Sequence, residues 1–193
     1  RRLGELRLAW AGWQIEHGRD GKAQVEASVA DFTRALEALP GNADVLRGRA
    51  TVRMNYGHWL ARTGRDPVAV YAAALADFDA LVAARPQEAD AWLNRGMIRV
   101  TRGLWRQGQN GDPLPDFAEA RPDLDRGFAL GARNADARMQ RGVVHHAHGE
   151  WEAAIADFDE AERLEPAGAR AWGPVREDAR QRLDQARCDE FVA

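Results

Sequence analysis

Apolar residues recur along this chain at the spacing of an α-helix. In one stretch, Val45, Val52, Tyr56 and Trp59 fall at positions i, i+7, i+11 and i+14. In the next stretch, six apolar residues fall at positions i, i+3, i+4, i+7, i+10 and i+11: Tyr71, Ala74, Leu75, Phe78, Leu81 and Val82. Amphipathic helices show this period, whereas half-buried strands alternate between apolar and polar residues. The pattern therefore predicts two successive helices and an all-α fold.

This two-helix pattern repeats along the chain. Four segments share one short sequence motif: Val29–Phe32, Leu75–Phe78, Arg121–Leu124 and Ile155–Phe158. The first three follow a 46-residue period, and the last comes after a shorter interval. Two columns keep the longer period throughout, namely the small residues Gly4, Ala50, Gly96 and Gly142 and the tryptophans Trp13, Trp59, Trp105 and Trp151. Such self-similarity is typical of stacked structural units that bury their faces against one another. We predict four units, 1–42, 43–88, 89–134 and 135–168, followed by a capping helix over 169–193.

The fourth unit resembles the 34-residue tetratricopeptide repeat. The resemblance rests on Arg141-Gly142 in the first helix, Gly149-Glu150-Trp151 at the turn, and Ala154, Phe158, Ala161 and Pro166 in and after the second helix. The second and third units carry the same pattern, so the resemblance covers about residues 1 to 168. It implies a right-handed α-solenoid of helical hairpins that acts as a protein-interaction scaffold, not as an enzyme. No cofactor is implied.

Units one to three are longer than this repeat by about 12 residues each. When positions are counted forwards from the start of each unit, the aromatic residue at the turn of the family pattern corresponds to one tryptophan per unit: Trp13, Trp59 and Trp105. Counted backwards from the Phe column, it is Val25, Tyr71 or Phe117. By the forward count, the fourth unit lacks residues between Trp151 and Phe158. We expect the extra residues to lengthen both helices by about six residues each, or about 9 Å. The three tryptophans then form a further layer, either as core of a taller hairpin or as an exposed ledge for a partner.

The resemblance also implies a concave wall made by the first helices, where peptides or partner helices bind. The family's groove columns correspond to Arg47, Thr51, Met54 and Asn55, then to Leu93, Met97, Val100 and Thr101, and then to Met139, Val143 and His146. Arg1, Glu5 and Leu8 would begin the row. All three methionines fall on it, and methionine adapts well at binding surfaces, so we expect a protein or peptide partner with apolar side chains. Alternatively, Met97 and Met139 touch each other and belong to the core.

One acidic position is filled identically in every unit, by Asp31, Asp77, Asp123 and Asp157. Arginines recur with the same period on the first helices, at Arg49, Arg95 and Arg141. Partly buried carboxylates are usually paired with a cation. We therefore predict a ladder of Arg–Asp pairs at the seams between units, with solvent-exposed aspartates as the alternative.

Composition and charge give no support for other partner classes. The 27 basic and 30 acidic residues leave a net charge of -3, so neither nucleic acid nor a membrane surface is an expected partner. The single cysteine, Cys188, excludes an internal disulfide, and no phosphate loop or nucleophile motif occurs. The chain starts at Arg1, and we expect it to be a piece of a longer protein. No feature indicates a compartment beyond a cytoplasmic default.

Two other functions remain open. His145, His146 and His148 lie close together, and the first and last are one helical turn apart, but zinc usually needs three or four ligands and no other cluster is obviously placed to help. A metal-binding protein is therefore a minor alternative, and His145 fits equally well in the helix column that Arg53 and Arg99 occupy. The other alternative is a structural spacer or homo-oligomerisation module of a larger signalling or secretion protein.

Overall fold

The computed structural model describes residues 21–168 and 172–192, and all regular secondary structure in these ranges is α-helical. The helices are α2 (Lys22–Ala38), α3 (Ala43–Arg62), α4 (Val68–Ala84), α5 (Ala89–Gly108), α6 (Leu114–Ala129), α7 (Ala135–Ala147), α8 (Trp151–Leu164) and α9 (Gly173–Val192). The predicted all-α fold is therefore confirmed. The predictions for Arg1, Glu5, Leu8 and Trp13 lie outside the described residues.

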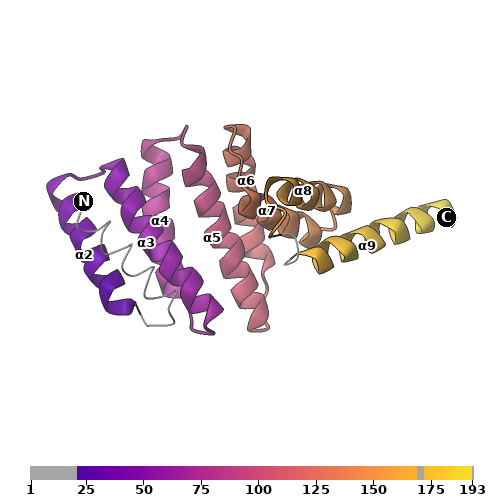
Figure 1. Cartoon of the computed structure of the whole chain (residues 1–193), viewed down its shortest axis with the longest axis horizontal. Helices are drawn as coiled ribbons and strands as arrows, with labels where there is room; N and C mark the ends of the chain where they lie inside the picture. The colour runs from indigo at the N-terminus through magenta and orange to yellow at the C-terminus, as the bar shows by residue number, and fades with distance from the viewer. Residues whose placement is uncertain (1–20, 169–171, 193) are drawn as a thin grey trace.

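The helices stand side by side in chain order (Figure 1). Short turns join α3 to α4, α5 to α6 and α7 to α8, so that each pair forms an antiparallel hairpin. The first helices of successive hairpins also touch, α3 with α5 and α5 with α7, and α9 packs on α8 before it extends away from the stack (Figure 1). This is a helical solenoid with a capping helix at its C-terminal end. The exact unit boundaries remain our proposal.

The turns between paired helices have the polar groups that their backbone requires. The Asp66 carboxylate accepts a hydrogen bond from the Val68 amide at 2.8 Å, and the Asp112 carboxylate accepts one from the Leu114 amide at 2.9 Å. Each carboxylate thereby satisfies an amide at a helix start that has no partner within the helix. Both helices begin just after the proline that follows the aspartate, α4 at Val68 and α6 at Leu114.

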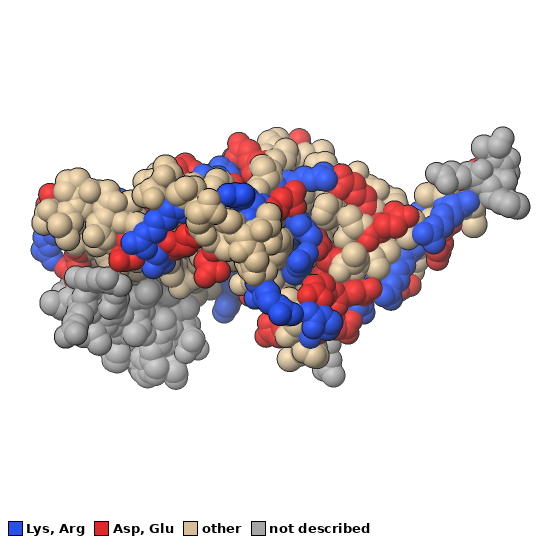
Figure 2. All heavy atoms as spheres, turned by 90° about the horizontal axis from the view of Figure 1, so that it is seen from above, with Lys and Arg blue, Asp and Glu red and all other residues tan. Residues whose placement is uncertain are grey.

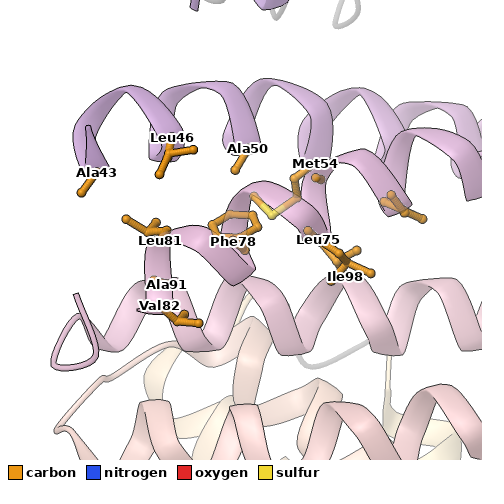
Figure 3. Close-up of a cluster of buried hydrophobic side chains, with 12 residues drawn as sticks. Ala43, Leu46, Ala50, Met54, Leu75, Phe78, Leu81, Val82, Ala91 and Ile98 are labelled. Carbon is orange, nitrogen blue, oxygen red and sulfur yellow. The ribbon is translucent and has the colours of Figure 1, made fainter. Parts of the chain in front are cut away.

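Apolar side chains from neighbouring helices fill the space between them. Figure 3 shows one cluster, in which Leu46, Ala50 and Met54 of α3 face Phe78 of α4 and Ile98 of α5 lies beneath. Phe78 and Ile98 are fully buried. Burial of this kind supplies most of the stability of a helix stack, because short helices are marginal alone.

Small residues allow paired helices to approach closely. A Cβ atom added to Gly142 would lie 2.8 Å from the ring of Phe158, and one added to Gly96 would lie 2.8 Å from Leu124. Real Cβ atoms do not come so close to another atom, so a side chain at either position would force its neighbour to move. Within these two hairpins the small residue of the first helix therefore packs against the residue of the Phe column.

The extra residues of the longer units lengthen the two helices of a hairpin unequally. The first helices α3 and α5 have 20 residues and α7 has 13, a difference of seven. The second helices α4 and α6 have 17 and 16 residues and α8 has 14, a difference of only two or three. The expected even extension of both helices is therefore wrong. Most of the added height lies in the first helices, and the turns take up part of the rest.

We number the hairpins after the predicted units, so that α5–α6 is the third hairpin and α7–α8 the fourth. The fourth hairpin also corrects our placement of the missing residues. Trp59 and Trp105 lie near the ends of first helices, but Trp151 is the first residue of the second helix α8. Trp151 precedes Phe158 by seven residues, as Tyr71 precedes Phe78. The missing residues therefore come from the end of the first helix, the turn and the start of the second helix, and do not lie between Trp151 and Phe158.

The tryptophans of the added layer differ in exposure. Trp59 is buried and stacks on Tyr56 of its own helix, with 5.6 Å between ring centroids. Trp105 is half-buried and lines a shallow surface pocket beside Leu104. Trp59 is therefore core, whereas Trp105 contributes to the surface.

Replacing Gly103 tests the close packing of the hairpins. A Cβ atom at Gly103 would lie 2.8 Å from the buried ring of Phe117, whereas one at Gly108 would meet no atom within 4 Å. We expect Gly103→Val to lower the free energy of unfolding by about 1–3 kcal/mol. Gly108→Val should change it by less than about 0.5 kcal/mol. Urea denaturation followed by circular dichroism measures both, and equal effects of the two substitutions would contradict this packing.

Candidate functional site

The predicted groove residues do not all reach the same surface. Five of them line a single hollow on the first helices: Met54, Asn55, Met97, Thr101 and Met139. Val143 and His146 line a second cleft, to which Met139 also contributes. Thr51 is half-buried on α3. The structure thus brings together seven of the predicted residues in two adjoining depressions.

The prediction that Leu93 and Val100 face a groove is wrong. Leu93 is 1% exposed and Val100 is fully buried, and both belong to the core between α5, α6 and α7. The helix α5 packs against α3, α4, α6 and α7, so only a narrow strip of its surface remains open. The repeat period identifies equivalent positions in successive units, but it does not show how narrow that strip is.

Arg47 links two hairpins. Its guanidinium bonds both carboxylate oxygens of Glu88, with Nε to Oε1 at 2.6 Å and Nη2 to Oε2 at 2.7 Å, and it also lies 3.3 Å from Asp44. The hydrogen bond with Glu88 raises the pKa of Arg47. Glu88 stands at the start of α5, so the pair ties α3 to the next hairpin. Arg47 therefore has a structural partner already.

The hollow that the first helices share, here called the central hollow, has a volume of about 470 Å³. Its lining comes from three helices: Met54, Asn55, His58, Ala61 and Arg62 of α3, Met97 and Thr101 of α5, and Asp136, Met139 and Gln140 of α7. All three methionines meet here. Met54 and Met97 are 9% and 8% exposed, so their side chains form the floor of the central hollow.

Two polar atoms in the central hollow are buried without a partner in the described part of the chain. They are Nε2 of His58 and Oε1 of Gln140. Buried polar atoms are nearly always hydrogen-bonded, so an unpaired one calls for an explanation. Burial lowers the pKa of His58, and the nearby Asp136 opposes this effect only in part. His58 is therefore neutral at pH 7, with one ring nitrogen able to donate and the other able to accept.

The second depression, here called the step cleft, lies where the long third hairpin meets the short fourth one. Its volume is about 580 Å³. The lining is Leu104, Gln107, Pro113, Leu114 and Phe117 of the third hairpin, Met139, Val143, His146 and Ala147 of α7, and Trp172 and Val175 next to and in α9. A shallow pocket lined by Ala61, Arg62, Thr101, Leu104 and Trp105 lies between the step cleft and the central hollow.

Sequence reasoning missed several lining residues because they belong to the added layer. His58 and Leu104 are 46 residues apart and occupy equivalent positions on α3 and α5. The 34-residue pattern has no columns at this height, so the resemblance could not point to them. The only sequence signal for these residues was the 46-residue period, which makes His58 and Leu104 equivalent positions.

The predicted Arg–Asp pairs exist, but the buried partner lies within the hairpin and not at the seam. Arg95 Nε donates to Asp123 Oδ2 at 2.8 Å, and Arg49 contacts Asp77 in the same way at 3.0 Å. The second arginine of each first helix, Arg53 or Arg99, bonds the same carboxylate. Four cations thus surround two aspartates, of which Asp77 is only 3% exposed. The negative charge of each carboxylate is therefore compensated by two arginines.

The seam is crossed by the other end of the same guanidinium. Arg95 Nη1 donates to Asp79 of the preceding hairpin at 2.9 Å, and Arg49 Nη1 donates to Thr33 of α2 at 3.0 Å. Burial lowers the pKa of Arg95, but the hydrogen bond and charge of Asp123 outweigh burial and leave the pKa raised. The seam prediction is therefore correct for the arginines and wrong for the buried aspartates.

Asp31 and Arg141 complete the series differently. The Asp31 carboxylate bonds Arg34 of its own helix. Arg141 Nε donates to Asp157 at 2.7 Å, and Arg141 Nη1 donates across the seam to Asp125 at 2.9 Å. The ladder thus runs through the three hairpins α3–α4, α5–α6 and α7–α8.

The three clustered histidines have separate partners. His145 Nδ1 lies 2.5 Å from Glu150 Oε2, and His146 Nε2 lies 2.6 Å from Asp178 Oδ2. His148 donates to a backbone carbonyl of its own helix. In the part of the chain that the structure describes, no three His, Cys, Asp or Glu side chains come together in a way that could hold a metal ion. His145 takes the place of Arg53 and Arg99, with Nε2 3.7 Å from the buried Asp157.

Figure 2 shows acidic and basic side chains interspersed on the visible face, with no extended patch of one sign. Within residues 21–168 and 172–192, no helix combines the length and the apolar character needed to cross a lipid bilayer. The depressions on the first helices are the surface features that the predicted groove residues line.

The chain is similar to tetratricopeptide repeat proteins in sequence and in structure. The tetratricopeptide repeat model matches residues 71–106 and 115–169. A tetratricopeptide repeat protein from Thermus thermophilus shares 22% identity over 98% of this chain and 94% of that chain, with a TM-score of 0.57. For YrrB, described as a TPR protein with an unusual peptide-binding site, the identity is 21%, the coverage 93% and 82%, and the TM-score 0.54.

A third solved structure, that of MamA, shares 16% identity over 95% of this chain and 90% of that chain, with a TM-score of 0.55. None of the curated proteins matches the chain. At these low identities the structural likeness shows the fold, a right-handed α-solenoid of helical hairpins. The fold predicted from the repeat pattern is confirmed.

Removing one partner of the buried ladder should be costly. We expect Asp77→Asn to lower the free energy of unfolding by about 3–5 kcal/mol, because Arg49 and Arg53 would lose their shared counter-charge. Asp159→Asn is the matched control, since its carboxylate is about half exposed and pairs with Arg176 at the surface. That substitution should cost less than about 1 kcal/mol. Thermal and urea unfolding measure both, and an equal cost would refute a structural role of the ladder.

The lowered pKa of His58 should make stability depend on pH. The folded-state pKa lies below the value of 6.5 that applies to the unfolded chain. As the pH falls through 6.5, the unfolded state therefore binds the proton first, and stability decreases down to the folded-state pKa. Between about pH 7.5 and about pH 5.5, wild type should lose more unfolding free energy than His58→Gln. If both proteins lose the same amount, His58 is not held neutral by burial.

Proposed function

This chain belongs to the tetratricopeptide repeat family, whose members are generally non-enzymatic protein-interaction scaffolds, and from this premise we propose that it binds an extended segment of a partner protein in the central hollow. The observation that carries the proposal is the meeting of three methionines and two unpaired polar atoms in that hollow. We propose no catalytic role, no cofactor and no nucleic-acid partner.

The methionines support an apolar side chain of the partner as the first point of contact. Met54, Met97 and Met139 come from three different helices and meet on one floor. Methionine has three rotatable bonds and a polarisable sulfur, so a methionine floor adapts to side chains of several shapes. This feature favours a partner that presents an aliphatic or aromatic side chain.

The unpaired polar atoms support recognition of the partner's backbone. His58 Nε2 and Gln140 Oε1 are buried at the wall of the central hollow. A peptide unit carries one N–H donor and one C=O acceptor, so a single extended segment can satisfy both atoms. Such pairing would remove the desolvation penalty of each orphan atom. Among the structural neighbours, YrrB is a TPR protein with a peptide-binding site, which is in keeping with this proposal.

Charge argues against a strongly acidic or basic partner segment. Arg62 and Asp136 both line the central hollow, and neither forms an ion pair within the described residues. Their charges are opposite, so a segment of one sign is attracted by one of them and repelled by the other. We therefore propose a segment of low net charge.

Site-specific photocrosslinking tests the proposed function. A benzophenone amino acid placed at Asn55, which is exposed at the central hollow, should capture a defined partner from extracts of the source organism. The same group at Ala76, which is exposed on α4, is the control. Asn55→Arg combined with Thr101→Arg should reduce capture at least about tenfold, since two long side chains would fill the central hollow. The matched surface pair Ala72→Arg with Ala76→Arg should leave capture unchanged.

Two results would contradict the proposal. Equal capture from Asn55 and Ala76, with both double variants folded by circular dichroism, would show that the central hollow is not the contact. Light scattering at two concentrations covers the remaining alternative. If the chain forms a larger species that the Asn55 and Thr101 substitutions abolish, then the hollow mediates self-assembly.

A further inference from the structure

The step cleft owes its existence to the change in hairpin height. Leu104 near the end of α5 and Leu114 at the start of α6 belong to the layer that the third hairpin has and the fourth lacks. The helix α7 ends at Ala147, so it does not cover these two leucines. The segment at Trp172 and Val175 closes the opposite side. A cavity of about 580 Å³ remains between them.

Two of the three large apolar side chains that are exposed among the described residues lie in this cleft. In the described ranges, three large hydrophobic side chains are exposed: Leu39 at 57%, Leu104 at 40% and Leu114 at 44%. Two of the three line the step cleft, alongside Met139 and Val143. Covering such side chains is favourable, and contiguous exposed apolar surface commonly marks an interaction site.

The cleft also contains an unpaired hydrogen-bond donor. Trp172 is 6% exposed, and its indole Nε1 is buried without an acceptor among the described residues. An indole N–H can only donate. This donor favours an occupant that brings an oxygen acceptor next to its apolar group.

The charges around the cleft indicate what kind of acceptor this is. His146 is the ionisable side chain in the lining, and its Nε2 already bonds Asp178 at 2.6 Å. Arg182 also bonds Asp178, at 2.7 Å. A carboxylate entering the cleft would lose its hydration. It would also meet the carboxylate of Asp178, whose partners His146 and Arg182 are already engaged. A neutral backbone carbonyl meets the Trp172 donor without this penalty.

From these observations we propose that the step cleft is a second docking surface, which takes a leucine-like side chain of a partner protein together with an adjacent backbone carbonyl. The cleft shares Leu104 with the shallow pocket at Ala61 and Thr101, and that pocket borders the central hollow. A chain molecule can therefore continue from one depression into the other. This continuity favours a polypeptide over a compact small molecule. The inference deepens the proposed function but does not require occupation of the central hollow.

Nuclear magnetic resonance of the full chain tests the proposal through the indole N–H signal of Trp172, assigned with Trp172→Phe. The probe is a hexapeptide, acetylated and amidated at its ends, with two central leucines flanked by serines. An analogue with two alanines is its control. The leucine peptide should shift the Trp172 signal downfield in a saturable way, because the N–H gains an acceptor. Trp172→Phe should weaken binding about two- to tenfold, as measured on neighbouring methyl signals.

Four variants decide the outcome. Leu104→Ser and Leu114→Ser should each weaken the response severalfold, whereas Leu39→Ser, the third exposed leucine, should not change it. The Asn55→Arg, Thr101→Arg double variant should retain the response, which separates this site from the central hollow. The proposal is overturned if the Trp172 signal does not move. It is equally overturned if the alanine peptide acts as well as the leucine peptide, or if the double variant alone abolishes the response.

Discussion

The stack depends on guanidinium groups that bond in two directions at once. Arg95 holds the buried Asp123 of its own hairpin and reaches Asp79 of the hairpin before it. A buried carboxylate needs more than one partner, and in this protein two first-helix arginines share each one. The same contact that closes a hairpin therefore also sets its position relative to its neighbour. Arg141 repeats the arrangement, so one geometry is passed along three successive hairpins.

Fixed seams mean that a change in hairpin height cannot be absorbed by sliding one hairpin past the next. Where the long hairpin α5–α6 is followed by the short hairpin α7–α8, the small residues Gly96 and Gly142 and the ladder remain in register. The difference must then appear at the far end of the hairpins, where α5 extends beyond α7. The step cleft is the consequence. Its exposed leucines reflect the missing layer of the fourth hairpin and not poor packing.

Properties that repeat were predictable from the sequence, and properties that depend on curvature were not. The recurrence of the small residues and of the Phe column predicted stacked helical units, because packing repeats with the chain. The burial of Leu93 and Val100 could not be predicted, because it depends on how closely α5 is enclosed by four neighbouring helices. The partner of Asp123 was placed at the wrong interface for a related reason. Periodicity gives the residues that recur together but not which side of the hairpin they face.

The two proposed surfaces contain the same repeated position of the added layer, placed in two different surroundings. His58 and Leu104 stand 46 residues apart at the same height of α3 and α5. At His58 the curved stack brings the start of α7 close, so a polar side chain becomes enclosed in the central hollow. At Leu104 the next hairpin has no matching height, and an apolar side chain stays open in the step cleft. A fourth unit of full length would extend its first helix past Ala147 and cover Leu104. The two proposed surfaces therefore lie where the repeat departs from regularity, since the regular positions are occupied by the packing and ion pairs of the stack itself.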